Sequence, residues 1–141
     1  METHVADHLA GAPLLSGLHV LVVDDDPGTL EILSNLLKHY GAIVIAVTSV
    51  REVLEVLDVL RPDVILSDIA MPGRTGFDLL QELESRDGGE SSIPVVAVTA
   101  QFGPEDRERM IALGFQDFVP KPVEPSNLVG VVARLGRPAT P

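Results

Sequence analysis

The sequence contains no cysteine, and this absence excludes several kinds of site. A chain without thiols forms no disulfide, no thiolate–zinc or iron–sulfur centre, and has no cysteine nucleophile. Long hydrophobic runs are also missing, because no apolar stretch reaches the roughly 18 residues that a membrane span needs. Residues 1–17 have neither a basic start nor a long apolar stretch, so we expect no secretory signal. These features suit a cytoplasmic protein that does not bind a membrane.

Basic residues are scarce. The chain has 10 Lys and Arg against 21 Asp and Glu, a net charge of −11. A protein that reads duplex DNA needs clustered Lys and Arg to neutralise phosphates, so we expect no nucleic-acid partner. Only two of the basic residues are lysines, Lys38 and Lys121. The length of 141 residues fits one domain, and the hydrophobic fraction of 45% is ordinary for a globular one.

Short apolar runs alternate with helical patterns along the chain. The runs are rich in Val and Ile, as in strands that are buried on both faces of a parallel sheet. Apolar residues at helical spacing follow each run, and the fourth of these helices should begin at Pro104. Five strand–helix units predict an α/β fold with parallel strands and helices on both faces of the sheet. The runs are residues 18–23, 43–47, 63–66, 93–98 and 115–119.

The residues that carry chemistry stand where these strands should end. In a parallel sheet of this kind, ligands bind beyond the carboxyl ends of the strands. The residues at the predicted ends are Asp24, Asp25 and Asp26 after the first run, Asp68 after the third, Thr99 and Ala100 after the fourth, and Lys121 after the fifth.

The three consecutive aspartates allow two interpretations. Asp26 stands before Pro27, which is typical of a helix N-cap followed by proline at the first helical position. Capping does not account for Asp24 and Asp25, although acidic residues at a helix start also favour the helix dipole. Oxygen ligands without neighbouring His or Cys suit a hard cation, magnesium before calcium or zinc.

Each of the other strand-end residues also has a structural and a functional interpretation. Asp68 is either a loop cap or a nucleophile that forms an aspartyl phosphate. Thr99 is either an ordinary strand threonine or a hydroxyl that donates to a phosphoryl oxygen. Lys121, between two prolines, is either a solvated lysine or the positive charge that a bound dianion needs. Pro120 suits a strand at the sheet edge, where a missing backbone donor does no harm.

Taken together, these residues resemble the receiver domain of two-component response regulators over about residues 18–135. Residues 1–17 and 136–141 would then be terminal tails. The resemblance implies a flavodoxin-like, doubly wound sheet of five parallel strands in the order 2-1-3-4-5, with five helices. The matching residues are Val22 to Asp26, Asp68 with Met71, Pro72 and Gly76 after it, Thr99 and Ala100, and Lys121 and Pro122.

The resemblance also implies a role for each acidic residue. Asp68 would be the phosphoacceptor. Asp25 and Asp68 would bind Mg²⁺ directly, Asp24 would bind it through water, and the carbonyl of Ala70 would complete the protein ligands.

The same resemblance implies a binding site for the phosphoryl group and a switch. Thr99, Ala100 and Lys121 would hold the phosphoryl oxygens, and the bond before Pro122 would be cis. Thr99 and Phe118 would form the switch, in which the aromatic ring turns inward when the Thr99 hydroxyl shifts. Phe118 stands where many relatives have tyrosine.

The expected function is therefore a phosphorylatable signalling switch. A histidine kinase or histidine phosphotransfer protein would donate the phosphoryl group, and the face of the fourth helix, fifth strand and fifth helix would bind a downstream protein. The domain would catalyse only its own phosphorylation and dephosphorylation. Because the chain ends soon after the fifth helix, we expect no attached output domain, either in a free-standing regulator or in a receiver cut from a hybrid kinase.

Two other classes of function stay open at this point. A magnesium-dependent phosphohydrolase of the haloacid type also uses an aspartate nucleophile, and residues 24–29 (DDDPGT) loosely resemble its first motif, although Pro27 interrupts it. A pseudo-receiver would bind partners without phosphorylation, which the intact acidic residues disfavour.

Overall fold

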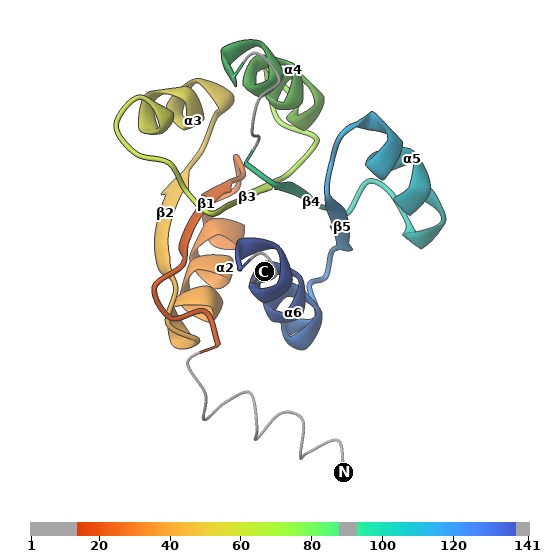
Figure 1. Cartoon of the computed structure of the whole chain (residues 1–141). Coiled ribbons are helices and arrows are strands. Elements are labelled where there is room, and N and C mark those ends of the chain that lie inside the picture. Colours follow the sequence, from red (N-terminus) through yellow and green to blue (C-terminus); the bar gives the residue numbers. More distant parts are fainter. Residues whose placement is uncertain (1–13, 88–92, 138–141) are drawn as a thin grey trace.

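The computed structural model describes residues 14–87 and 93–137, and within them it shows a five-stranded sheet (Figure 1). All neighbouring strands pair in parallel, in the order β2-β1-β3-β4-β5, which confirms the expected fold class. β5 lies at an edge, as Pro120 indicated. The strands are β1 (His19–Val23), β2 (Ile43–Val47), β3 (Val64–Ser67), β4 (Val95–Thr99) and β5 (Asp117–Pro120).

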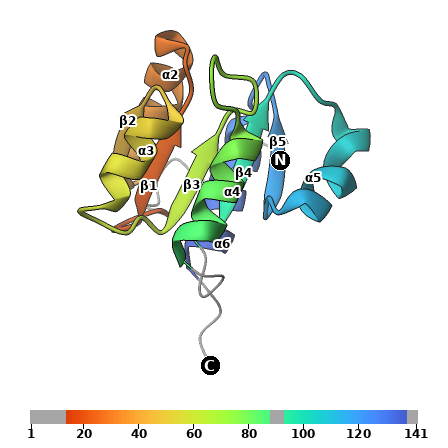
Figure 2. The ribbon, with the colours of Figure 1, turned by 90° about the horizontal axis from the view of Figure 1, so that it is seen from above.

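Five α-helices in the described residues cover both faces of the sheet. α2 and α6 pack on one face, and α3, α4 and α5 pack on the other, so that the sheet is the middle layer (Figures 1 and 2). Across the described ranges, no helix is long and apolar enough to cross a membrane. The helices are α2 (Pro27–His39), α3 (Val50–Leu57), α4 (Gly76–Asp87), α5 (Arg107–Leu113) and α6 (Pro125–Gly136).

The core has two halves because successive strand side chains point to opposite faces of the sheet. Leu66 of β3 packs with Leu37 of α2, whereas its neighbour Ile65 packs in the other half with Met110 of α5. Every residue of β3 and β4 is buried, as expected for the inner strands of a parallel sheet. The carboxyl ends of the strands are thereby held at one edge.

The packed core extends further towards the N-terminus than the boundary at residue 18. Leu15 is fully buried, and its backbone N–H donates to the carbonyl of Tyr40 at 2.8 Å. The guanidinium of Arg137 donates to the carbonyl of Ser16, so the two ends of the described chain meet. The rest of the predicted tails, residues 1–13 and 138–141, lies outside the described residues.

Some predicted element ends differ from the observed ones. The fourth helix begins at Arg107 rather than Pro104, because Pro104–Asp106 forms a short 3₁₀ turn. α5 ends at Leu113 and is followed by Gly114 as its C-cap, whose φ of 122° is a backbone conformation that glycine adopts easily. Phe115 was expected in the fifth strand, but it is a buried core residue that precedes the strand.

The loop after β3 folds tightly against the backbone of Asp68. The N–H of Gly76 donates to the carbonyl of Ile69 at 2.9 Å. A Cβ at position 76 would lie 2.8 Å from the carbonyl oxygen of Asp68 and 3.1 Å from the Cα of Ile69. Only glycine allows this approach, and so Gly76 determines how the segment after Asp68 is placed.

Candidate functional site

Four strand ends bring the predicted residues together at one edge of the sheet. Asp24 follows β1, Asp68 follows β3, Thr99 ends β4 and Lys121 follows β5. The Nζ of Lys121 donates to Oδ2 of Asp24 at 2.7 Å and to Oδ2 of Asp68 at 3.4 Å. Asp68 and Asp24 thus contact Lys121 directly, although they lie 53 and 97 positions away from it in the sequence.

Three carboxylates form a compact oxygen cluster beside this lysine. One ligand oxygen from each of Asp24, Asp25 and Asp68 lies within 4.8 Å of the other two. Asp24 and Asp68 are buried, whereas Asp25 is exposed. Like charges this close repel one another, and a divalent cation relieves that repulsion. An oxygen-only donor set with a solvent-facing side fits Mg²⁺, which keeps part of its water shell.

The carboxylate of Asp68 is held in a fixed orientation. Its Oδ1 accepts from the backbone N–H of Ile69 at 2.7 Å and that of Ala70 at 3.3 Å, while Oδ2 faces Lys121. The hydroxyl of Ser67, which the sequence analysis did not single out, donates to the carbonyl of Asp68 at 2.7 Å. The Asp68 N–H donates to the carbonyl of Val23 at 3.0 Å and so ties the site to β1.

Asp24 and Asp26 form different hydrogen bonds and have different structural roles. Asp26 is the N-cap of α2, as predicted: its side chain accepts from the N–H of Thr29 at 3.0 Å and from the Thr29 hydroxyl at 2.7 Å. These hydrogen bonds hold the pKa of Asp26 below its usual value. Oδ1 of Asp24 accepts from the N–H of Asp26 at 2.9 Å, which orients Asp24 towards Lys121.

Lys121 is a charged group in a partly buried position. Burial alone would lower its pKa, but the hydrogen bond and charge of Asp24, together with Asp68, outweigh burial and raise the pKa above its usual value. The Lys121 N–H donates to the carbonyl of Thr99 at 3.0 Å, so its backbone continues the pairing of β4 and β5. The bond between Lys121 and Pro122 is cis.

Thr99 at the end of β4 and Phe118 on β5 are both buried. The Thr99 side chain is buried, and its hydroxyl oxygen accepts from the N–H of Gln101 at 3.2 Å. Phe118 is 0% exposed and packs in the core half that contains Ala97 and Met110. The Phe118 ring is already buried in this structure, so an inward turn of the ring cannot begin from it.

Two other positions that were expected at the site are exposed. Ala70 follows Asp68 by two residues, and Ala100 follows Thr99. Ala70 borders the acidic cluster, because its backbone N–H donates to Oδ1 of Asp68.

A further charged cluster was not predicted from the sequence. Asp117 at the start of β5 is 5% exposed and pairs with Arg107 of α5 and Arg134 of α6. The only signal in the sequence was an aspartate inside a strand, where this residue type is rare. The arginines lie 10 and 17 residues away, so their convergence required the folded chain.

Solved structures with the same fold include receiver domains. One, from Pseudomonas aeruginosa, is titled as the receiver domain of the sensor histidine kinase PA1611 with a magnesium ion coordinated in the active site cleft. It is 26% identical to this chain, the TM-score is 0.75, and the match covers 86% of this chain and 98% of that one.

Sequence relatives point to the same family. A Leptolyngbya boryana protein named "Uncharacterized 14.6 kDa protein in sodA1 3'region" is 38% identical over 118 residues, covering 84% of this chain and 89% of the relative. The DNA-binding response regulator MtrA of Mycolicibacterium smegmatis is 35% identical over 119 residues, covering 84% of this chain. The chain spans only 50% of the length of MtrA.

The family model of the response regulator receiver domain matches residues 20–133. That range contains β1 from its second residue, the other four strands, and the whole acidic cluster with Lys121. The chain therefore belongs to the response regulator receiver domains of two-component systems.

Proposed function

We propose that Asp68 accepts a phosphoryl group from a phosphohistidine of a histidine kinase or a histidine phosphotransfer protein. The observation that supports this role most strongly is the position of Asp68 between an acidic pair and a lysine ammonium. A carboxylate oxygen of Asp68 attacks phosphorus, the phosphorus–nitrogen bond breaks, and its electron pair goes to the imidazole. The acceptor is then an aspartyl phosphate.

Asp68 is a better acceptor than its acidic neighbours because they are engaged in other ways. Asp24 is bound by Lys121 at 2.7 Å and by the N–H of Asp26. Asp25 is exposed on the solvent side of the cluster. Asp68 is preoriented by two backbone N–H groups and faces Lys121, so both its geometry and its environment suit attack on an anionic phosphoryl group.

The reaction is proposed to depend on Mg²⁺. Asp25 and Asp68 would bind the ion directly, Asp24 through water, and the Ala70 carbonyl would complete the protein ligands. Bound there, the ion supplies positive charge to the oxygens of the transferring phosphoryl group. Without Mg²⁺, the three carboxylates outnumber the one ammonium of this cluster, and the remaining negative charge would repel an incoming dianion.

Lys121, Thr99 and Ala100 are proposed to hold the phosphoryl oxygens once transfer is complete. The Thr99 hydroxyl oxygen accepts from Gln101, so its proton remains to be donated to a phosphoryl oxygen. Lys121 already bridges Asp24 and Asp68, and one of its donors can follow the phosphoryl group. Thr99 is the last residue of β4, and Lys121 directly follows β5.

The output is proposed to leave through the face formed by α5, β5 and α6, here called the output face. Phe118 is buried on β5, so the response would pass through the backbone of β5 rather than through an inward ring turn. Phosphorylation would favour one of two existing arrangements of this face.

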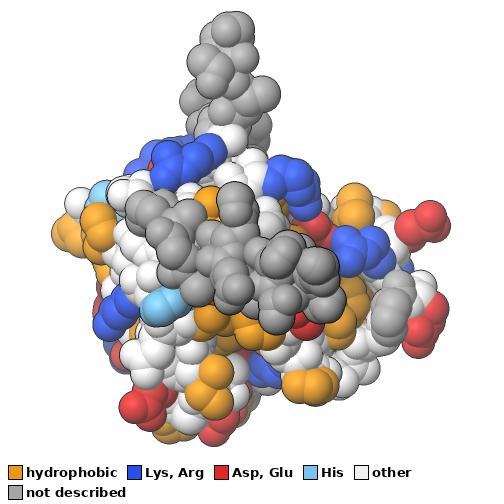
Figure 3. Space-filling model, turned by 90° about the horizontal axis from the view of Figure 1, so that it is seen from below, with side chains coloured by type: hydrophobic (Ala, Val, Ile, Leu, Met, Phe, Trp, Pro, Cys, Tyr) orange, Lys and Arg blue, Asp and Glu red, His pale blue; other side chains and the backbone are white. Residues whose placement is uncertain are grey.

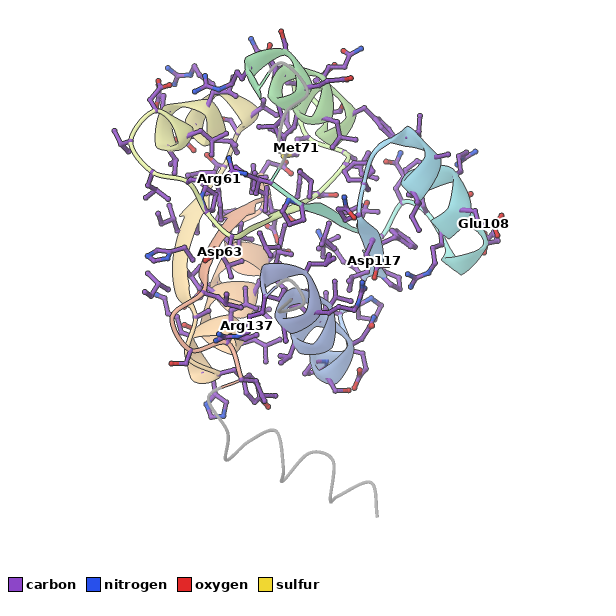
Figure 4. The ribbon with its side chains drawn as sticks, in the orientation of Figure 1. Arg61, Asp63, Met71, Glu108, Asp117 and Arg137 are labelled. Carbon is purple, nitrogen blue, oxygen red and sulfur yellow. The ribbon has the colours of Figure 1, made fainter. Side chains whose placement is uncertain are left out.

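Intact-mass measurement with a small phosphodonor and magnesium tests the proposed function. The parent should gain one phosphoryl group, and Asp68→Asn should gain none. Asp63→Asn is a matched control, because Asp63 stands just before β3, at the opposite end of the strand from Asp68 (Figure 4), and this variant should be labelled like the parent. Full labelling of Asp68→Asn, or no labelling of the parent, would overturn the proposal.

A measurement of catalytic turnover distinguishes the proposed receiver function from the phosphohydrolase alternative. A receiver should be labelled once per chain, whereas a phosphohydrolase should release many equivalents of product from an aryl phosphate. Sustained release that requires Asp68 would favour the hydrolase.

A further inference from the structure

The strand β2 lies at one edge of the sheet and has none of the features that usually keep an edge strand from pairing. It pairs with β1 along its whole length without a bulge. Its sequence, IVIAV, contains no charged residue and no proline. The other edge strand, β5, contains both Asp117 and Pro120. Charges, prolines and bulges commonly protect exposed strand edges, so β2 is the edge that is open to a further strand.

The side chains of β2 are also more accessible than those of the inner strands. All residues of β3 and β4 are buried, whereas every residue of β2 is half-buried or exposed. Ile43 is 49% exposed, although it is a large apolar residue in a strand. A strand that pairs with β2 would remove part of this apolar surface from water.

Two residues of β2 turn their backbone groups towards the open edge. The N–H of Ile43 donates to the carbonyl of the residue before β1 at 2.8 Å, and the carbonyl of Val47 accepts from the residue after β1 at 3.2 Å. Because alternate residues of a parallel strand bond to the same neighbour, Ile45 also bonds to β1. Val44 and Ala46 therefore present their N–H and C=O groups to the open edge.

This open stretch matches a second copy of itself. The N–H groups on either side of it are used within the chain, because Ala42 donates to a carbonyl of α2 at 3.1 Å and Thr48 donates to a carboxylate of α3 at 2.7 Å. In an antiparallel pair of β2 strands centred on Ile45, Val44 of each copy would lie opposite Ala46 of the other copy. Residues in this position exchange both of their backbone hydrogen bonds.

The helix α2 brings two opposite charges to the same edge. In Figure 1, α2 lies between β2 and α6. Leu36, on one flank of α2, is half-buried against the core half that α2 shares with α6. The opposite flank carries Glu31 and Lys38, which are both exposed and about two turns apart. Within residues 14–87 and 93–137, neither of these two charges has an ion-pair partner.

Antiparallel pairing of β2 would also place these charges opposite one another. The two copies of α2 would run antiparallel on the same face of the joined sheet, so Glu31 of each copy would face Lys38 of the other. These two ion pairs would offset part of the repulsion between chains that each carry a net charge of −11. In Figure 3, where the β2 side is at the left, hydrophobic, basic and acidic side chains follow one another along that rim.

We propose that two copies of this chain associate through β2 and form one continuous sheet. The pair is a closed two-fold dimer, in which β2 contacts β2 and α2 contacts α2. Because the paired strands are antiparallel, the two acidic clusters lie at opposite ends of the joined sheet. Neither Asp68 lies at the shared edge, and so this inference does not depend on the proposed function.

The unphosphorylated full chain is used for the test, at about 0.15 M salt, where repulsion between distant charges is screened. Sedimentation should show a monomer in dilute solution and a dimer at high protein concentration. Amide hydrogen exchange then reports the pairing. The N–H groups of Val44 and Ala46 should exchange more slowly as protein concentration rises, whereas that of Ile45, which bonds to β1 in each copy, should be slow throughout.

Charge-reversal variants test the contact between the helices. Glu31→Lys and Lys38→Glu should each weaken self-association about tenfold, because both symmetric ion pairs become repulsive. A mixture of the two variants should form a mixed dimer with an affinity close to that of the parent, because like charges on one copy then face opposite charges on the other. Glu108→Lys is the matched control: it changes the net charge as much as Glu31→Lys, but on α5, far from β2 (Figure 4), and should not weaken association.

A backbone variant tests the contact between the strands. Ala46→Pro removes a donor that faces solvent in the monomer, where proline is tolerated in an edge strand, and should abolish the dimer. Ala46→Val keeps the donor and should associate like the parent. Thermal unfolding shows whether each variant is folded. If Ala46→Pro does not fold, the exposed charge-reversal variants decide the question.

Four results would overturn the proposal. The first is a monomer at every protein concentration, which would leave the edge to a different partner. The second is slow exchange of Val44 and Ala46 at every concentration, because a segment of the same chain would then cover the edge. The third is a dimer that Glu108→Lys disrupts and Glu31→Lys does not. The fourth is a mixture of Glu31→Lys and Lys38→Glu that associates no better than either variant alone.

Discussion

At the scale of single residues, charge balance decides what the site does. Three carboxylates lie within 4.8 Å of one another, and a single ammonium is in contact with two of them. The acids and the lysine could be singled out from the sequence because each follows a buried apolar run. Their distances could not, because these depend on how four strands lie side by side.

The first prediction concerns the exposed ligand. Asp25→Asn should weaken Mg²⁺ binding at least about tenfold, the scale on which changes around a metal site act. The Lys121 contacts with Asp24 and Asp68 should survive, because Asp25 takes no part in them. Amide signals of residues 24–26 and 68–70 during a magnesium titration measure the affinity. An Asp25→Asn affinity equal to that of the parent would remove Asp25 from the site.

The second prediction separates switching from chemistry. Lys121→Ala should still be labelled by a small phosphodonor, more slowly than the parent, because Asp68 keeps its backbone hydrogen bonds to Ile69 and Ala70. It should lose the change in amide exchange that phosphorylation causes in residues 99–135. A normal exchange response in labelled Lys121→Ala would exclude the lysine from the switch.

The third prediction follows from the raised pKa of Lys121. A group whose pKa is higher in the folded state stabilises that state below its unfolded pKa, and this contribution is lost as pH rises through the folded value. The loss should therefore appear above pH 10.5, the ordinary pKa of the group. Urea unfolding at increasing alkaline pH, without magnesium, should show a steeper loss for the parent than for Lys121→Met. Parallel curves would contradict the coupling to Asp24.

At the scale of elements, the loop from Asp68 to Gly76 controls the geometry of the site. The strands and most helices were predictable because apolar residues recur with the period of each element. The start of the fourth helix was not predictable, because the residues Pro104–Asp106 form a 3₁₀ turn and the apolar spacing does not distinguish such a turn from the first turn of an α-helix. The pairing of Asp117 with arginines of two helices left no periodic signal either.

The fourth prediction tests that loop. Gly76→Ala should lower the free energy of unfolding by on the order of 1–3 kcal/mol, the usual cost of overpacking, and should slow labelling, because the new Cβ would meet the Asp68 carbonyl oxygen at 2.8 Å. Gly130→Ala is the matched control, since no atom lies within 4 Å of its new Cβ. In the helix interior it should stabilise by about 0.5–1 kcal/mol. Urea unfolding measures both, and a stable, normally labelled Gly76→Ala would contradict the loop's role.

At the scale of the whole molecule, site and fold are linked because the ligands come from separate strands. Asp24 and Asp68 are brought together only when β1 and β3 pair. The order of the strands in the sheet was predicted from the resemblance to receiver domains, because the periodicity of apolar residues does not specify which strands are neighbours. The buried position of Phe118 was not available at all, since the side chain could have faced either way until β5 was packed against α5.

The fifth prediction follows from this linkage. An ion that binds only the folded chain stabilises it by RT ln(1 + [L]/Kd), so Mg²⁺ at ten times its dissociation constant should add about 1.4 kcal/mol to the free energy of unfolding. Thermal unfolding with and without magnesium should show this gain in the parent and in Asp63→Asn. The gain should fall to about 0.4 kcal/mol or less in Asp25→Asn at the same magnesium concentration, because that variant should bind the ion at least about tenfold more weakly. Equal gains in all three chains would place the ion elsewhere.

The most direct test of the central claim is to locate the phosphoryl group on the chain. After treatment with a small phosphodonor and magnesium, borohydride reduces an aspartyl phosphate to an alcohol, and peptide masses then identify the carboxylate that reacted. The account predicts reduction at Asp68 and at no other acidic residue. Reduction at Asp24 or Asp25, or an unmodified Asp68 in labelled protein, would contradict it.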